Sequence, residues 1–463
     1  MVFSSLEFVF RFLPIFMLAY FATPAGYRNI VLVAGSMVFY AVGEPVYVFL
    51  MMASIAVNFY LARAMAGCKK RTARFLLGTA ILLDLGVLFF FKYLNFFIFN
   101  VCSAVGISAP RLKLILPLGI SFYTFQMMSY IIDVYRERYK ACESIIEVAA
   151  YISMFPQLIA GPIVSFDEVR LRLENRRVRF ADIEWGMMLF VLGLVYKVLL
   201  ADNIASLWND VMVAGVMGID AAAAWLGAWG YTMQIYFDFF GYSLMAIGLG
   251  KLLGFNLPEN FSNPYCSVSV TEFWRRWHIT LGRWFREYVY IPLGGSKKGI
   301  GRMVFNTFIV WLLTGLWHGA AWNFIIWGMA FFVLIILEKL LYLGFLEKHR
   351  LIGHLYMLFI IPVSWVVFNI TDLGELKLYL LRMFGGCGIL PGSVSGAEKL
   401  FSLLGSYWWL LIICALCATP FPMKLAKKFR DSLGLKLVLL LLFWLCVYQM
   451  AVQKSNPFLY FRF

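Results

Sequence analysis

The chain has 463 residues, of which 62% are hydrophobic, 18% aromatic and only 14% charged. This composition excludes an ordinary soluble globular protein and indicates a polytopic membrane protein. A formal net charge of +15 would suggest a nucleic-acid partner in a soluble protein. In a membrane protein, positively charged cytoplasmic loops explain the same charge, so we expect the lipid bilayer as partner and no nucleic acid.

Apolar runs near membrane-spanning length recur along the chain and predict one all-α membrane domain over 1–463. We expect about 11 to 13 membrane segments and no separate catalytic module. Proline and glycine residues interrupt several runs, so some segments should be broken or re-entrant around a polar pocket. The expected segments are 6–22, 30–43, 46–66, 75–101, 114–135, 147–164, 185–201, 221–240, 303–318, 321–343, 352–370, 400–419 and 434–452.

Basic clusters at 69–74, 170–179, 275–302 and 424–430 predict the orientation of the chain. If all four face the cytoplasm, the three segments before the first cluster place the N-terminus outside. The run after Met1 has no basic n-region, so we interpret it as the first span and not as a cleaved signal. The tail NPFLYFRF (456–463) is interpreted as an interface anchor, with a plug as the alternative.

The segment from Phe273 to Trp327 carries the main functional candidates. Helical spacing from Phe273 places tryptophans on one arc and arginines on the opposite arc, which predicts an amphipathic helix lying at the membrane interface. His278 is at the edge of the apolar arc and can face the interior. His318 lies in an apolar run next to Trp317, where an ionisable group is costly and is a functional candidate.

Neutral imidazole in an apolar site can accept a proton from a hydroxyl, so His318 is a candidate general base. A hydrogen bond between helices is an equally good explanation from the residues alone. Asp238 interrupts an aromatic run and must be paired, neutralised or facing water. It could orient a histidine, line a polar channel or only join helices. Trp317 and Asn323 are further pocket candidates.

Ordinary hydrolase and metal-site motifs are absent from the sequence. There is no HExxH, no GxSxG and no Cys/His set with zinc spacing, so no metal site is expected. Cys414 and Cys417 form a CxxC inside an apolar run, which favours small buried residues over a metal or redox pair. The turn 294–299, which contains Lys297 and Lys298, could cradle phosphates, although a basic cytoplasmic loop explains it as well.

Two segments, EFWRRWHITLGRWFREYVYIPLGG (272–295) and GLWHGAAWNFIIWG (315–328), resemble the membrane-bound O-acyltransferase (MBOAT) family. The resemblance is to its bacterial branch that O-acetylates polysaccharides such as alginate. It covers nearly the whole chain, with a signature core over about 117–328 and C-terminal helices with an aromatic tail over 352–463. The further matching segments are 117–136, 155–163, 234–255 and 456–463.

The resemblance implies a ring of tilted helices in a bacterial plasma (inner) membrane, with a funnel joining a cytoplasmic donor to an extracytoplasmic acceptor. His318 takes the position of the essential membrane histidine, and His278 that of the second family histidine. Acetyl-CoA is the implied donor substrate, with no permanently bound cofactor. A polysaccharide is the implied acceptor, and an exported acetyltransferase is the implied partner.

One departure concerns the acceptor. The alginate branch is expected to have SGYSDMAIG, whereas this chain has FGYSLMAIG, with Phe240 and Leu244 in place of polar residues. We therefore expect a polysaccharide other than alginate.

The expected reaction is acetyl transfer to an outward hydroxyl, with His318 as general base and His278 positioning donor or acceptor. The cations that could attract coenzyme A phosphates are Arg275, Arg276, Lys297 and Lys298. Taken singly, each is better explained as an interfacial cation. The alternatives are D-alanyl transfer to teichoic acid from a carrier-protein thioester, and a transporter without acyl turnover.

Overall fold

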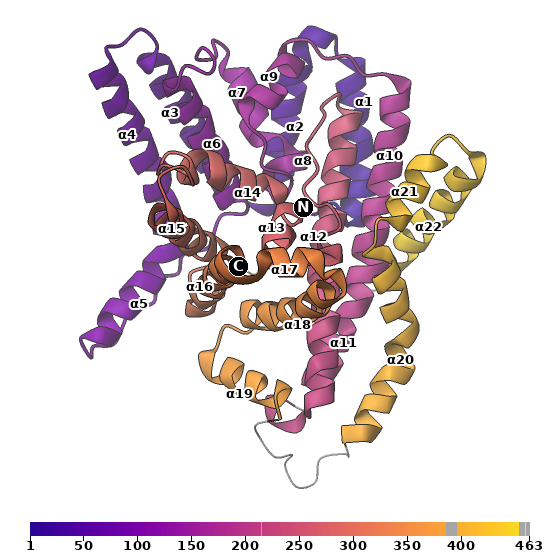
Figure 1. Ribbon diagram of the computed structural model, residues 1–463. Helices are drawn as coiled ribbons and strands as arrows, with labels where there is room; N and C mark the ends of the chain where they lie inside the picture. The colour runs from indigo at the N-terminus through magenta and orange to yellow at the C-terminus, as the bar shows by residue number, and fades with distance from the viewer. Residues whose placement is uncertain (214, 386–395, 453–458, 460–463) are drawn as a thin grey trace. The chain divides into compact units, whose positions relative to one another are not determined.

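The computed structural model describes residues 1–213, 215–385, 396–452 and 459, and this part of the chain is helical and contains no β-strand (Figure 1). Nine of its helices are long and apolar enough to cross a membrane, and the apolar helix Phe8–Ala22 is shorter. The all-α polytopic fold class is therefore confirmed. The tail 456–463 lies outside the described residues except for Leu459.

The described chain divides into two compact units, and the first contains Met1–Phe190 and Tyr242–Pro258. No observation tests the expectation that 1–463 forms one membrane domain, which stays a prediction. The helices of the first unit are α1 (Leu13–Ala22), α2 (Arg28–Gly43), α3 (Tyr47–Met65), α4 (Lys70–Leu88), α5 (Leu94–Ala104), α6 (Ile120–Tyr135), α7 (Ile145–Ser153), α8 (Phe155–Leu158), α9 (Phe166–Glu174), most of α10 (Phe180–Leu194) and the end of α12 (Ala221–Leu252).

The expected segment 147–164 is broken in the structure, because α7 ends at Ser153 and the four-residue helix α8 follows it. Pro156 stands in the first turn of α8, where its missing N–H costs no helical hydrogen bond. The main-chain N–H of Phe155 donates instead to Ser36 Oγ of α2, at 3.1 Å. The broken segment is thus buried in protein, as non-helical backbone at membrane depth must be.

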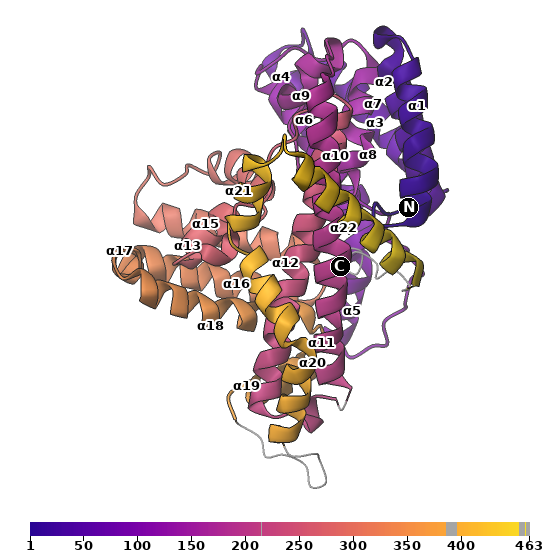
Figure 2. The ribbon, with the colours of Figure 1, turned by 90° about the vertical axis from the view of Figure 1, so that its right-hand side faces the viewer.

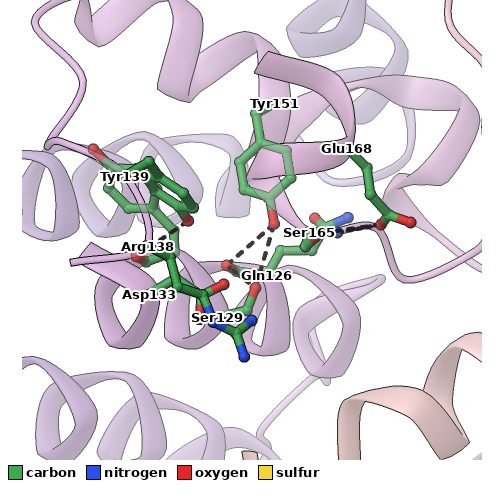
Figure 3. Close-up of polar contacts among 9 residues, drawn as sticks. Gln126, Ser129, Asp133, Arg138, Tyr139, Tyr151, Ser165 and Glu168 are labelled. Carbon is green, nitrogen blue, oxygen red and sulfur yellow. Dashed lines mark hydrogen bonds and ion pairs between the residues drawn. The ribbon is translucent and has the colours of Figure 1, made fainter. Parts of the chain in front are cut away.

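Helix α6 forms the centre of the first unit, since every residue from Ile120 to Val134 except Ile132 is buried. Figure 3 shows how its polar groups are used. The Tyr151 hydroxyl of α7 donates to the carbonyl of Val164 at 2.8 Å and lies 3.4 Å from the carbonyl of Gln126. The Ser129 hydroxyl donates to the same Gln126 carbonyl at 2.8 Å. These bonds join α6 to α7 and the extended chain that follows.

The second unit contains Val191–Gly241 and Glu259–Val452. Its helices α11 and α20 lie side by side in Figure 2, and Tyr407 of α20 donates to Asp210 of α11 at 2.6 Å. The helices are the end of α10 with the π-helical turn Val195–Ala201, α11 (Asp202–Met212), most of α12, α13 (Val270–Arg276), α14 (Ile279–Phe285), α15 (Ile300–His318), α16 (Trp322–Leu337), α17 (Leu343–Lys348), α18 (Arg350–Asn369), α19 (Leu373–Met383), α20 (Gly396–Cys417), α21 (Phe421–Lys428) and α22 (Leu433–Val452).

The expected amphipathic helix from Phe273 is divided in the structure. Helix α13 ends at Arg276 and α14 begins at Ile279, with His278 between them at a φ of +45°. A left-handed φ is costly for a residue with a side chain and has to be held by the surroundings. The break moves His278 off the arc that one continuous helix would give it and places it in the protein interior, where it is 2% exposed.

Candidate active site

His318 is the last residue of α15, and the turn to α16 follows it directly. The two helices touch through glycines. A Cβ on Gly328 would lie 2.5 Å from the carbonyl oxygen of Trp311, and one on Gly315 would lie 2.5 Å from that of Phe324. Only residues without a side chain allow this approach, which brings the first turns of α16 against the end of α15.

Aromatic rings surround the imidazole of His318, which is 4% exposed. The ring centroids of Trp317, Trp327 and Phe368 lie 5.0, 5.0 and 5.1 Å from it, each approximately edge to face. Asn323 holds the main chain at Phe368, the last of these three residues. Its amide donates to the carbonyls of Val367 and Phe368 at 3.2 and 2.9 Å, so the end of α18 is tied to the start of α16.

His278 has a polar partner that defines its tautomer. Its Nδ1 lies 3.1 Å from Asn260 Oδ1. The same oxygen accepts from the main-chain N–H of Thr280 at 3.3 Å and from the Thr280 hydroxyl at 2.9 Å. Because an amide oxygen can only accept, Nδ1 of His278 carries the proton and Nε2 is the acceptor nitrogen. Burial lowers the pKa of His278 to about 3, so the ring is neutral near pH 7.

The two predicted histidines meet at one indole ring. The Trp317 centroid lies 5.0 Å from that of His318 and 5.8 Å from that of His278. The residues are 40 positions apart in sequence, with His278 in the break between α13 and α14 and His318 at the end of α15. The structure therefore joins His278, Trp317 and His318 into one buried cluster, with Asn323 supporting its edge through Phe368.

Asp238 is paired with a residue that the sequence reasoning missed. Its Oδ1 lies 2.6 Å from Lys197 Nζ, and the same nitrogen lies 2.7 Å from Asp202 Oδ1. Lys197 is 3% exposed and lies in the π-helical turn of the second unit. A lone lysine inside the expected segment 185–201 was the available signal, because a charge in such a run needs a partner.

Asp238 and the histidine cluster are neighbours through helix α12. The next residue, Phe239, lies edge to face against His278 with centroids 4.8 Å apart. Phe240, one of the two departures from the alginate branch, stacks on Tyr236 at 5.3 Å and contacts Tyr196 at 5.0 Å. In this chain Phe240 thus packs within an aromatic core of the second unit.

The four predicted phosphate-binding cations are not brought together. Arg275 lines a cavity with Trp274 and Arg286, whereas Arg276 forms an ion pair with Glu272 at 2.5 Å. Lys297 and Lys298 are exposed in the turn before α15. Asn260, Lys197 and Arg286 join the candidates only in the structure. The catalytic and binding roles of all these residues stay predictions.

The fold defines a multi-pass membrane protein with two buried histidines beside one indole ring. Comparison with known proteins gives the family. The membrane-bound O-acyltransferase family model matches residues 142–363. A protein named probable alginate O-acetylase AlgI from Azotobacter vinelandii is 34% identical over the whole of both chains. The chain belongs to the membrane-bound O-acyltransferase family.

Other relatives agree with this assignment. A probable alginate O-acetylase AlgI from Pseudomonas aeruginosa is 39% identical over 81% of this chain and 73% of its own. A peptidoglycan O-acetyltransferase from Helicobacter pylori is 33% identical over 84% of this chain and 81% of its own. The protein is accordingly an O-acyltransferase of the polysaccharide O-acetyltransferase branch, and the predicted family and enzyme class are confirmed.

Proposed function

We propose that the protein moves an acetyl group from cytoplasmic acetyl-CoA across a bacterial plasma membrane for O-acetylation of a cell-surface polysaccharide. The observation that carries the proposal is the burial of His278 and His318 around one indole, in a chain whose relatives are named alginate O-acetylase and peptidoglycan O-acetyltransferase. Acetyl-CoA is a substrate in this proposal and no cofactor is bound permanently. An exported acetyltransferase completes delivery to the polysaccharide, and the N-terminus is outside.

His318 acts as general base in this scheme. Its imidazole takes the proton of the acceptor hydroxyl as the hydroxyl oxygen attacks the thioester carbonyl. The new C–O bond forms, the C–S bond breaks, and the departing thiolate of coenzyme A takes up the proton that His318 holds. The protonation state of the histidine is thereby restored, and no further reactant is needed.

His278 positions the donor or acceptor. The bond from Nδ1 to Asn260 fixes the ring, and Nε2 is the nitrogen that can accept from a hydroxyl. The apolar ring of Phe239 beside His278 favours neutral imidazole over imidazolium, which suits a hydrogen-bond acceptor.

The test is transfer of radiolabelled acetyl from acetyl-CoA to extracytoplasmic glycan or partner protein, in membranes carrying the native chain, His318→Ala or His318→Gln. Label should appear with the native chain and vanish with both variants, provided that each variant inserts and folds. His349→Ala is the matched control, because this histidine lies between α17 and α18, away from the histidine cluster. It should keep native transfer.

Two results would redirect the proposal. Label absent with the native chain and its cognate partner, but present when a carrier-bound D-alanyl thioester is supplied, would replace acetyl transfer by D-alanyl transfer to teichoic acid. Solute transport across the membrane that continues in His318→Ala, together with no acyl transfer by the native chain, would indicate a transporter instead.

A further inference from the structure

Two arginines of the first unit share one phenol ring. The guanidinium carbons of Arg28 and Arg176 lie 5.4 and 5.7 Å from the ring centroid of Tyr20. Arg28 is the first residue of α2, and Arg176 follows the end of α9. The ring itself is fixed, because Tyr20 is buried and its hydroxyl donates to the carbonyl of Leu253 at 2.7 Å. Two positive charges that are distant in sequence are thus held beside one rigid ring.

Asn29 joins the two segments that carry these arginines. Its amide nitrogen donates to the carbonyl of Leu173, in the last turn of α9, at 3.0 Å. Its Oδ1 accepts a hydrogen bond from the guanidinium of Arg176. The turn between α1 and α2 is therefore tied to the end of α9, and the fold itself brings the two guanidinium groups together.

The positive charge of this arginine pair is not compensated by the protein. Neither Arg28 nor Arg176 forms an ion pair with a carboxylate in the part of the chain that the structure describes. Arg176 lies over the ring of Phe255, 4.6 Å from its centroid, and its Nε and Nη1 are buried without a hydrogen-bond partner among the described residues. A ring face attracts a cation but carries no net charge. Because a half-buried charge without a counter-ion is unfavourable, an anion would stabilise the pair.

The start of α2 adds to the positive potential. The first turn of this helix contains no acidic residue, and its N-cap residue Tyr27 makes no side-chain cap. The N-terminal end of a helix carries a partial positive charge, which favours an anion close to it. Arg28 stands at this end and is half-buried, so a ligand can reach it from the surface.

An exposed apolar surface begins beside the arginine pair. Leu18 and Phe21 on α1 and Ile30 on α2 are all exposed. The expected membrane segments 6–22 and 30–43 lie on either side of the turn that contains Tyr27, and the aromatic ring of this residue is exposed as well. The turn is therefore expected at the boundary between the hydrocarbon and the headgroups, where aromatic residues are enriched. A phospholipid has the same order of parts, with a phosphate above its acyl chains.

We propose that Arg28 and Arg176 bind the phosphate of an anionic phospholipid whose acyl chains lie along the exposed apolar side of α1 and α2. Guanidinium groups match phosphate in charge and in hydrogen-bond geometry. Two uncompensated cations favour a lipid with a net negative charge, such as phosphatidylglycerol. They disfavour phosphatidylcholine, because its trimethylammonium group adds a further positive charge. The inference concerns the first unit and does not depend on the proposed function.

The sequence-based orientation agrees with an anionic lipid. Arg176 belongs to the basic cluster 170–179, which we expect on the cytoplasmic side, and basic residues at that surface attract anionic headgroups. Free phosphate offers the same chemistry without the acyl chains, so the test has to separate these two sources.

The experiment titrates the purified full chain in detergent with phosphatidylglycerol or phosphatidylcholine and counts bound lipids by native mass spectrometry. Arg28→Gln and Arg176→Gln should each raise the apparent Kd for phosphatidylglycerol about tenfold, since each removes a bond to a charged group. The Kd for phosphatidylcholine should change little. Arg71→Gln is the matched control, because Arg71 is exposed in the first turn of α4 in the same unit, and it should leave both Kd values unchanged.

Conservative variants separate lipid binding from a structural role of the arginines. Arg176→Lys keeps a positive charge and should bind phosphatidylglycerol more tightly than Arg176→Gln. Tyr20→Phe loses the bond to Leu253 but keeps the ring beside both guanidinium groups, and its Kd should stay close to native. Added phosphatidylglycerol should raise the melting temperature of the native chain and of Arg71→Gln more than that of Arg28→Gln, because a ligand stabilises the folded state that binds it.

Other outcomes overturn the proposal. One is an equal Kd for phosphatidylglycerol in the native chain and in folded Arg28→Gln, and another is no preference of the native chain for phosphatidylglycerol over phosphatidylcholine. Arginine-dependent binding of inorganic phosphate, without binding of phosphatidylglycerol, assigns the site to free phosphate. A rise in Kd that is equal for Arg28→Gln, Arg176→Gln and Arg71→Gln indicates a general attraction between basic residues and anionic lipid, and no site at the arginine pair.

Discussion

The indole ring of Trp327 lies edge-on against the imidazole of His318, with the ring centroids 5.0 Å apart and the planes at 84°. The contact depends on the close approach of α15 and α16, since Trp327 precedes Gly328 at the point where the two backbones touch. Trp327 also contacts Trp274 of α13 and Phe368 of α18. Rings from two further helices therefore hold the indole that packs against His318. Its bulk should decide how firmly His318 is held.

Trp327→Leu should lower kcat for acetyl transfer by about tenfold to a hundredfold, because a small displacement of a catalytic group can cost that much. Trp327→Phe keeps an aromatic edge beside His318 and should retain more activity. Trp322→Leu is the control on the same helix, since Trp322 is 49% exposed. Steady-state kinetics would contradict this role of Trp327 if the Leu and Phe variants behaved alike.

Asn260→Asp should move the acid side of the pH–rate profile upward. In the native chain burial lowers the pKa of His278 to about 3. This ring therefore stays neutral from pH 5 to 8, and its titration does not change the rate in that range. A carboxylate beside Nδ1 favours the imidazolium and raises this pKa. As pH falls below the raised pKa, Nε2 becomes protonated and activity should be lost.

The control for this prediction is Thr280→Val, which removes one hydrogen bond to Asn260 without adding charge. It should leave the position of the acid side unchanged even if it lowers the overall rate. An unchanged profile in a folded Asn260→Asp variant would mean that the charge state of His278 does not affect the rate.

Lys197→Met should destabilise the protein much more than Asp238→Asn. Removing the lysine leaves the buried Asp238 and the largely buried Asp202, whose side chain is 13% exposed, without their shared cation. Loss of one partner of a buried pair costs about 3–5 kcal/mol. Asp238→Asn keeps the pair between Lys197 and Asp202, so its cost should be smaller.

Thermal unfolding of the detergent-solubilised variants measures this difference. Lys377→Met is the control, because Lys377 is exposed on α19. Equal melting temperatures for the Lys197 and Asp238 variants would show that the two carboxylates do not depend on the lysine.

Gly328→Ala should separate α15 from α16. The new methyl group would lie 2.5 Å from the carbonyl oxygen of Trp311 and 3.2 Å from the Cα of Gly315, and backbone atoms cannot turn aside. Overpacking of this kind costs about 1–3 kcal/mol, and the shift should also reduce kcat by displacing His318. Gly301→Ala on α15 is the control, because nothing lies within 4 Å of a Cβ there. Melting temperature and kcat, measured together, should fall only for Gly328→Ala.

The sequence by itself determined the fold class. Backbone polar groups within a bilayer must bond internally, so long apolar runs have to become helices, and most of the expected segments are found. It also singled out His278, His318 and Asp238, because ionisable residues in apolar surroundings are few and costly. His318 and Asp238 could be found without knowing which helices touch.

Only the tertiary structure decided what these residues contact. Asn260 meets His278 because the chain breaks between α13 and α14, a break that helical periodicity does not reveal. Lys197 meets Asp238 and Trp327 meets His318 because particular helices pack together. Hydropathy reports which residues avoid water, since transfer out of water is a property of each side chain. Which buried side chains meet is set by packing between segments distant in sequence, where glycines such as Gly328 decide how closely two helices approach.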